Sequence, residues 1–385
     1  MSGYFLYHSI GTFPGKARLM AEALARFSAV WSAEDDGQWP AAMAERQAFI
    51  ERWTALIDAP SGSLTTVESV TAGLHLLIGG LPAEHLRGRR VLVAGDCFPS
   101  LHFLLAGLAE RFGFVLDTVP LRPGETWVRD DDVIARWGAD VGVALLTLVT
   151  STASYRGDLA RLAAHGRRMG TLVGADITQG VGVVPFSLAA TPVDFVVSTS
   201  LKWLCGTSGA GILQVRPALA AACRPELRGW FSQQDPFSWD LDAFRFAPDA
   251  RRFDNGTPAV LASVASRPGL DWVAATGIDA IRAQNLAHAE RIIAEADANG
   301  WRLASPRDAA RRGGSVMILV PDAVAPAEVV TRLRAEKLYC DARGRALRLS
   351  PGVVTTPECV EALCGHLRRL LGGPARVAPR LAAGA

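Results

Sequence analysis

The sequence predicts an α/β protein: a three-layer sandwich built on a mainly parallel sheet, accompanied by a smaller α+β domain. Between about residues 60 and 260, short apolar runs alternate with helix-like segments, and strand–helix–strand order favours parallel pairing. After about residue 260 the pattern changes to long helices separated by short strands. A chain of 385 residues is also long enough for two domains.

Five apolar runs are the predicted strands of the large sheet. Each is short and continuous, as expected for strands that are buried on both faces. They are RVLVAGD (90–96), VGVALLTLV (141–149), GTLVGAD (170–176), VDFVVSTS (193–200) and GILQV (211–215). Segments 100–112 and 157–169 between them have helical periodicity. Ligands of such sheets gather at the carboxyl ends of the strands, so we expect the site there.

The domain limits follow from the change of pattern. We expect a large domain over 51–260, a small α+β domain over 261–372 and a loose tail over 373–385. Residues 1–50 should pack on the small domain. The predicted small-domain helices are 262–275, 278–299, 326–337 and 357–371, with strands near 314–320 and 346–349.

Composition argues against several classes of protein. A net charge of +2 with scattered basic residues gives no reason to expect nucleic acid or an anionic membrane as a partner. No run approaches the roughly 18 apolar residues of a membrane span, and the first residues do not resemble a signal peptide. The six cysteines form no CxxC pair or His/Cys cluster, so we expect neither metal nor disulfides, and a cytoplasmic location.

A carboxylate and a lysine follow two of the predicted strands. Asp176 ends one strand and Lys202 lies just past another, so both should point into one crevice. An amine that forms an imine with an aldehyde, and a carboxylate that keeps a pyridine nitrogen protonated, fit pyridoxal phosphate (PLP) chemistry. Only three lysines occur in the chain. Taken singly, a strand-end aspartate is usually a cap and a lone lysine is usually solvated.

Several motifs, in order and with matching spacing, carry a resemblance to a known family. They are YFLYHSIGTFP (4–14), TAGLHLL (71–77), CFPSLH (97–102), GWF (229–231) and KLYCDARGRALRLSPG (337–352). The chain resembles the fold-type I PLP enzymes of the class V aminotransferase group, and within it most resembles the kynureninases. The resemblance implies PLP as cofactor, an amino-acid substrate and a homodimer with shared active sites.

The resemblance also assigns roles to individual residues. It implies that Lys202 is the Schiff-base lysine and proton shuttle, and that Asp176 pairs with the pyridine nitrogen. Phe98 would lie on the ring, Val70 and Thr71 would hold the phosphate at a helix start, and Thr150 would contact the cofactor near its phenolic oxygen. Further cofactor-binding positions are Thr199 and Trp230, the latter near the phosphate. Arg348 would bind the substrate α-carboxylate, and Ser9 is a second substrate-binding position.

The chain departs from the kynureninases at several positions. Leu201 replaces a tyrosine, Leu101 replaces an aspartate and Gln179 replaces a histidine. Gln179 instead resembles the glutamine of cysteine desulfurases that bonds the PLP phenolate. Thr257, in FDNGTPA, resembles a threonine of those relatives that reaches the partner's phosphate across a dimer interface. Cys340 aligns with a kynureninase segment and is interpreted as structural.

These departures leave several reactions open. Cleavage at the β carbon, by a C–C or C–S lyase or hydrolase, is the first expectation because the kynureninases are most similar. Transamination is the second, followed by decarboxylation and epimerisation. A catalytically inactive PLP-fold binding protein is a remote alternative, against which the retention of Lys202, Asp176 and Arg348 argues.

Overall fold

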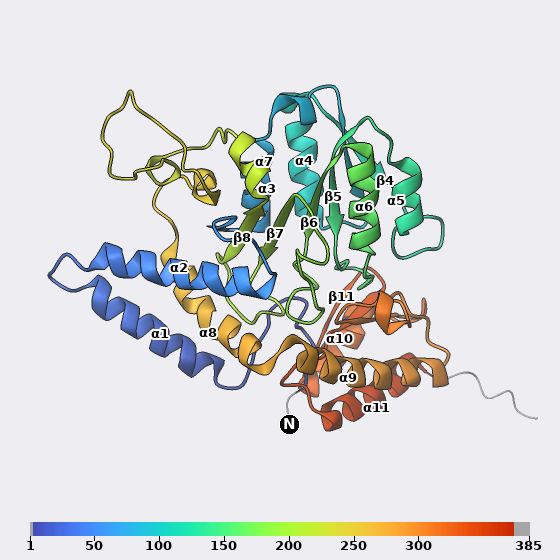
Figure 1. The fold of residues 1–385 in the computed structure, drawn as a ribbon. Helices are drawn as coiled ribbons and strands as arrows, with labels where there is room; N and C mark the ends of the chain where they lie inside the picture. The colour runs from blue at the N-terminus through green and yellow to red at the C-terminus, as the bar shows by residue number, and fades with distance from the viewer. Residues whose placement is uncertain (1–2, 373–385) are drawn as a thin grey trace, which may run out of the picture.

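The computed structural model describes residues 3–372, and its centre is a seven-stranded sheet (Figure 1). The strands are β2 (Leu64–Val67), β3 (Arg90–Ala94), β4 (Val115–Val119), β5 (Val141–Thr147), β6 (Leu172–Asp176), β7 (Phe195–Thr199) and β8 (Gly211–Val215). They follow the order β2-β8-β7-β6-β5-β3-β4. Neighbours from β7 to β4 are parallel, whereas β8 runs antiparallel to both β7 and β2. The parallel carboxyl ends therefore meet at one edge.

Helices cover both faces of this sheet. They are α2 (Gln38–Leu56), α3 (Val70–Ile78), α4 (Pro99–Phe112), α5 (Asp130–Arg136), α6 (Leu159–Met169) and α7 (Pro217–Ala222). Val143 and Leu145 of β5 join the core that contains α3 and α4, whereas Ala144 and Leu146 join the core that contains α2, α5 and α6. Successive strand residues point to opposite faces, so continuous apolar runs supply both cores. The predicted three-layer α/β architecture is confirmed.

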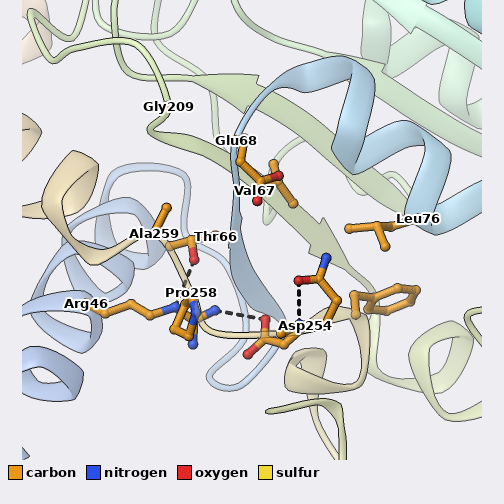
Figure 2. Close-up of a pocket in the computed structure, with 12 residues that line it drawn as sticks. Arg46, Thr66, Val67, Glu68, Leu76, Gly209, Asp254, Pro258 and Ala259 are labelled. Atoms are coloured by element: carbon orange, nitrogen blue, oxygen red, sulfur yellow. Dashed lines mark hydrogen bonds and ion pairs between the residues drawn. The ribbon is translucent and has the colours of Figure 1, made fainter. Parts of the chain in front are cut away.

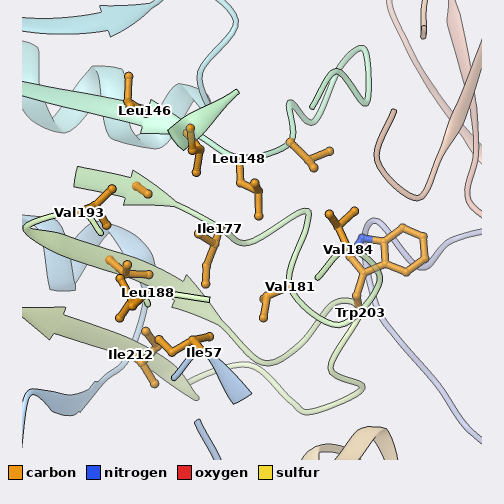
Figure 3. Close-up of a cluster of buried hydrophobic side chains, with 14 of the residues drawn as sticks. Ile57, Leu146, Leu148, Ile177, Val181, Val184, Leu188, Val193, Trp203 and Ile212 are labelled. Carbon is orange, nitrogen blue, oxygen red and sulfur yellow. The ribbon is translucent and has the colours of Figure 1, made fainter. Parts of the chain in front are cut away.

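One of these cores also supports the segment that carries Lys202. In Figure 3, Ile57, Ile177 and Ile212 gather on one face of the sheet with Trp203, the residue next to Lys202. Trp203 is almost completely buried. Because its neighbour is packed in the core, the backbone at Lys202 is held in place although the segment has no regular secondary structure.

A second sheet lies beside the first and has its own core. Its strands β9 (Val316–Leu319), β11 (Asp341–Arg343) and β12 (Ala346–Leu349) are antiparallel, in the order β11-β12-β9. The core between this sheet and its helices includes Ile292, Val329 and Leu363. The helices are α9 (Ile278–Ala298), α10 (Pro326–Ala335) and α11 (Pro357–Leu371). Figure 1 shows these helices as a separate layer below the large sheet.

The N-terminal segment, residues 3–56, contacts both the unit built on the large sheet and the smaller unit built on the second sheet. β1 (Gly3–Tyr4) pairs in parallel with β10 (Leu338–Tyr339), and α1 (Lys16–Trp31) and α2 pack along α8 (Val260–Thr276). Between them, the amide of Gly11 donates to the carbonyl of Leu201 at 2.9 Å. A Cβ at Gly11 would lie 1.8 Å from the carbonyl oxygen of Lys202, so only glycine allows this approach.

The large sheet has two strands that the sequence patterns did not predict, namely β2 and β4. The antiparallel direction of β8 also came only from the structure. The tail expected over 373–385 lies outside the described residues. Across residues 3–372, no helix is both long enough and apolar enough to cross a membrane.

Candidate active site

A cavity of about 320 Å³ lies at the carboxyl edge of the parallel strands. Its wall includes the last residues of three neighbouring strands, Thr147 of β5, Asp176 of β6 and Thr199 of β7. Lys202 lines the same cavity. This volume lies within the usual range for small-molecule sites. The carboxylate and the amine that the sequence places near one sheet edge therefore line a single cavity.

Asp176 is buried, and its environment favours a retained proton. Its Oδ1 accepts a hydrogen bond of 2.9 Å from the amide of Thr178. Burial raises the pKa of the Asp176 carboxyl, while Thr178 and the charge of Lys202 oppose that rise. The carboxyl is thus suited to share a proton with a basic ring nitrogen in the cavity.

Lys202 carries the second ionisable group of the cavity. Burial lowers the pKa of its amine to about 8, the charge of Asp176 opposes the shift, and the charge of Arg348 adds to it. The Nζ atom lies 5.2 Å from the centroid of the Phe98 ring. A lysine with a lowered pKa has more of the neutral amine near neutral pH, which is the nucleophilic form.

The first turn of α3 forms another part of the wall. Val70 and Thr71 are its first two residues and both line the cavity. The side chain of Ser69 caps the helix by accepting from the amide of Ala72 at 3.1 Å. The remaining first-turn amides have no partner within the helix, and the helix dipole favours an anion beside them. This part of the cavity is suited to a phosphate.

Gln179 and Phe98 also line the cavity. The Nε2 atom of Gln179 donates to the carbonyl of His8 at 2.9 Å, and its Oε1 accepts from Nε1 of Trp203 at 3.3 Å. One Nε2 hydrogen of Gln179 remains for a ligand. Phe98 precedes α4 and is 43% exposed, so its ring has a face open to the cavity.

Arg348 lies behind the cavity wall, on β12 opposite Asp341 of β11. Its Nε donates to Oδ1 of Asp341 at 2.8 Å, and its Nη2 donates to Oδ2 of the same carboxylate. Its Nη1 lies 3.4 Å from the carbonyl of Ser151, a residue that lines the cavity. Ser9 lies in an exposed turn and is not among the cavity-lining residues of the described chain.

Three predicted cofactor contacts, Thr150, Trp230 and Thr257, are not among the residues that line this cavity within 3–372. The hydroxyl of Thr150 accepts from the amide of Tyr155 at 3.1 Å. Trp230 stacks edge-on against Trp39, with ring centroids 5.8 Å apart. Thr257 is exposed in the loop before α8. Within one chain, these side chains do not join Lys202 and Asp176.

A small hollow adjoins the cavity, and Glu68 and Gly209 line both (Figure 2). In this hollow, Nη2 of Arg46 donates to Oδ1 of Asp254 at 2.8 Å, and both side chains are buried. The pair joins α2 to the loop that carries Thr257. Breaking a buried ion pair leaves an uncompensated charge, so this loop is firmly anchored.

The sequence motifs contained site residues that sequence reasoning did not single out. His8 is buried, its Nε2 lies 3.0 Å from Oδ1 of Asp341, and its Nδ1 lies 2.6 Å from the hydroxyl of Ser350. A signal for Asp341 was present, because the two-residue loop Gly344-Arg345 predicts a hairpin that places it opposite Arg348. No local sequence pattern connects His8 with Asp341, Arg348 or Ser350, because more than 330 residues lie between His8 and these positions.

The groups that line the cavity fit pyridoxal phosphate. The amine of Lys202 can bind its aldehyde, the carboxyl of Asp176 its ring nitrogen, and the start of α3 its phosphate. Phe98 supplies an aromatic face. Within residues 3–372, no group of three or more His, Cys, Asp or Glu side chains is arranged to hold a metal ion.

Two relatives show which proteins this chain is similar to in sequence. An uncharacterized aminotransferase of Bacillus subtilis, YcbU, is 26% identical over 329 residues, which cover 83% of this chain and 82% of that protein. A kynureninase of Deinococcus radiodurans is 30% identical over 288 residues, which cover 70% of this chain and 68% of the relative. This chain is thus similar in sequence to proteins with both names.

Solved structures show the same fold. An apo cysteine desulfurase from Thermococcus onnurineus NA1 matches with a TM-score of 0.85 and 18% identity, covering 96% of this chain and 94% of the other. The cystine C–S lyase C-DES, in complex with cysteine persulfide, also has a TM-score of 0.85, with 17% identity and coverage of 97% and 98%. Residues 41–348, which include Asp176, Lys202 and Arg348, match the family model for aminotransferase class V. The chain therefore belongs to the class V aminotransferase family.

Proposed function

We propose that this enzyme cleaves a bond at the β carbon of an α-amino acid, as a C–C or C–S lyase or hydrolase. Its membership of the class V family makes it a PLP-dependent enzyme. One observation carries the site assignment: the amine of Lys202 and the carboxyl of Asp176 line one cavity together with the start of α3.

In this proposal, each side chain of the cavity has a defined task. When bound, PLP supplies an electron-withdrawing ring that delocalises negative charge from the substrate α carbon. Asp176 would hold a proton at the ring nitrogen, because its carboxylate would supply the counter-charge that a protonated pyridine nitrogen needs. Lys202 removes the proton from the α carbon and returns one at the β carbon, a task for which a pKa of about 8 is suitable.

Substrate binding is assigned to the opposite side of the cavity. Arg348 binds the α-carboxylate through guanidinium hydrogens that Asp341 does not occupy. The apolar side chains of Val70, Val149 and Leu201 exclude water from the reacting atoms. Ser9 is exposed and has a place in substrate binding only if a partner or the substrate itself reaches that turn.

β-Cleavage is preferred because several sequence relatives are named kynureninase and one structural neighbour is a cystine C–S lyase. Transamination is the second candidate, favoured by the family name and by YcbU. The two differ in their need for an amino acceptor. A β-cleaving enzyme should release a side-chain fragment, detected by mass spectrometry, over many turnovers without added 2-oxo acid. Product formation that stops after one turnover and resumes when 2-oxo acid is added would instead support transamination.

The role of Lys202 can be tested without a known substrate. Reduction of the PLP-loaded protein with borohydride should attach the cofactor irreversibly to the peptide that contains Lys202. The Lys202→Ala variant should trap no PLP, whereas Lys337→Ala, which changes one of the other two lysines, should trap as much as the wild type. PLP trapped by the Lys202→Ala variant would remove the assignment. A wild-type protein that cannot be loaded with PLP would support the inactive binding protein.

A homodimer with shared active sites is part of the proposal. Thr257 is exposed in an anchored loop beside the cavity, as expected for a residue that contacts the phosphate bound by a partner. Trp230 begins a segment that projects from the large unit in Figure 1 and exposes Phe237, Trp239 and Leu241. Large apolar side chains exposed together usually mark an interface. We also propose that Thr150 and Thr199 contact the cofactor, and Thr199 lines the cavity.

The proposal also includes a division into domains and a cellular location. The domain division assigns the cavity to residues 51–260 and the guanidinium of Arg348 to residues 261–372. A cytoplasmic location is supported by the six cysteines, all of which are free and buried. Protonated, buried thiols persist in reducing compartments, where disulfides are rare.

A further inference from the structure

Arg348 has two faces that can bind a carboxylate, and one of them is already occupied. Its Nε and Nη2 atoms donate side-on to the two oxygens of Asp341, from directly across the β11–β12 hairpin. Among residues 3–372, its end-on face, formed by Nη1 and the second Nη2 hydrogen, has only a long contact of 3.4 Å, from Nη1 to the carbonyl of Ser151. Ser151 lines the cavity whereas Arg348 does not, so the guanidinium lies one residue behind the cavity wall.

Asp341 is in turn held from the N-terminal segment. Nε2 of the buried His8 lies 3.0 Å from Oδ1 of Asp341, the oxygen that also accepts from Nε of Arg348. On the other side of the ring, Nδ1 of His8 lies 2.6 Å from the hydroxyl of Ser350, which lies 2.6 Å from the hydroxyl of Ser315. The three side chains His8, Ser350 and Ser315 are all buried.

This chain of contacts is compatible with the His8 tautomer that carries its ring proton beside Asp341. If Ser315 donates to Ser350 and Ser350 donates to Nδ1, the ring proton lies on Nε2, the nitrogen that is 3.0 Å from Oδ1 of Asp341. The carbonyl of His8 accepts from Gln179, which lines the cavity. The backbone of His8 is therefore bound to Gln179 of the cavity wall, and its ring lies beside Asp341, the partner of Arg348.

We propose that Asp341 and His8 are positioning residues that fix the guanidinium of Arg348 so that its end-on face receives the substrate α-carboxylate. The proposal rests on the proposed function of Arg348. The opposite possibility is that Asp341 competes with the substrate for Arg348. Positioning is favoured because the side chain of Arg348 is only 7% exposed, and a buried guanidinium needs a permanent counter-charge.

The experiment compares matched ligands with and without a carboxylate, using PLP-loaded protein. Binding of L-alanine and ethylamine, and of L-phenylalanine and phenethylamine, is measured from the absorbance of the bound cofactor. Asp341→Asn should reduce the preference for each amino acid over its amine about tenfold, with PLP content unchanged. His8→Gln should reduce it about threefold. Asp322→Asn, which removes the exposed partner of Arg345 on the same hairpin, should leave it unchanged.

Each other outcome has a defined meaning. An unchanged preference in Asp341→Asn would overturn the positioning role, and an increased preference would show that Asp341 competes with the substrate. If Asp341→Asn does not take up PLP, the preference measured in His8→Gln is used instead. A reduced preference supports the positioning role, and an unchanged or increased preference overturns it. A PLP-loaded wild type that prefers neither amino acid over its amine would contradict the role of Arg348 itself.

A second measurement uses the protein without PLP. In nuclear magnetic resonance spectra of protein with ¹⁵N-labelled histidine, Asp341→Asn should lower the pKa of His8, because the carboxylate raises it. The Asp322→Asn control should not change it. A His8 signal that is identical in wild type and Asp341→Asn would show that the two side chains are not in contact, which overturns the proposal.

Discussion

At the scale of single residues, the environment of Lys202 determines how the site responds to pH. An exposed lysine amine has a pKa of about 10.4, and burial lowers that of Lys202 to about 8. Only the neutral amine attacks the aldehyde of PLP. The fraction of neutral amine increases as pH rises through the pKa, so the proposed role of Lys202 makes PLP binding depend on pH between about pH 7 and pH 9.

We therefore expect the rate of PLP capture by the cofactor-free protein to rise with pH, with a midpoint at about pH 8 and a plateau about one pH unit higher. Stopped-flow absorbance over a pH series measures the midpoint. Because the charge of Asp176 raises the pKa of Lys202, Asp176→Asn should move the midpoint to lower pH. A wild-type midpoint near pH 10 would contradict the burial of this amine.

At the scale of secondary-structure elements, the start of α3 links helix capping to phosphate binding. The hydroxyl of Ser69 accepts from the amide of Ala72 and fixes the turn whose amides line the cavity. Removing a hydroxyl cap typically costs about 1 kcal/mol. Loss of this cap should loosen the first turn, so its amides would bind an anion less well.

We expect Ser69→Ala to lower the free energy of unfolding by about 1 kcal/mol and to weaken PLP binding several-fold. Denaturant unfolding and equilibrium titration with PLP measure the two effects. Thr356 caps α11 in the same way, by accepting from the amide of Cys359, and lies in the small unit. Thr356→Ala should cost similar stability without changing PLP affinity. Equal affinity losses in both variants would make the Ser69 effect indirect.

The elements also show what the sequence could and could not predict. The parallel strands were predicted because their apolar runs supply both cores. β2 and β4 were missed because each contains polar residues whose partners lie far away in the sequence. Thr65 and Thr66 of β2 bind Arg46, and Asp117 of β4 binds Arg90 and Arg136. Such strands form only where remote partners satisfy their polar groups, and short-range patterns do not contain this information.

The same distinction applies to the site. Asp176 and Lys202 were placed together because strand order brings the carboxyl ends of neighbouring strands to one edge. The pairing of Asp341 with Arg348 follows from a local hairpin and could have been predicted. The approach of His8 to that pair depends on how the N-terminal segment crosses between the two units, which neither periodicity nor spacing determines.

At the scale of the whole molecule, a second copy should complete the site. We expect the protein to sediment as a dimer, because the segment after Trp230 exposes Phe237 at 62%, Trp239 at 83% and Leu241 at 94%. The double variant Phe237→Ser/Trp239→Ser should shift sedimentation toward the monomer and weaken PLP binding. Val115→Ser, which changes an apolar residue that is 62% exposed on β4, at the opposite edge of the large sheet from β2, is the matched control. A wild-type monomer that binds PLP tightly would contradict the shared site.

The pairing of β1 with β10 affects how the protein folds during its synthesis on the ribosome. The large sheet can assemble once residue 215 has emerged, but Gly3 and Tyr4 find their partners only when residues 338–339 have been made. Gly3 and Tyr4 therefore stay without these strand partners until residues 338–339 have been synthesised. A large fusion partner before Gly3 would hinder the pairing of β1 with β10. A tag at the other end of the chain should therefore give protein with a higher PLP content.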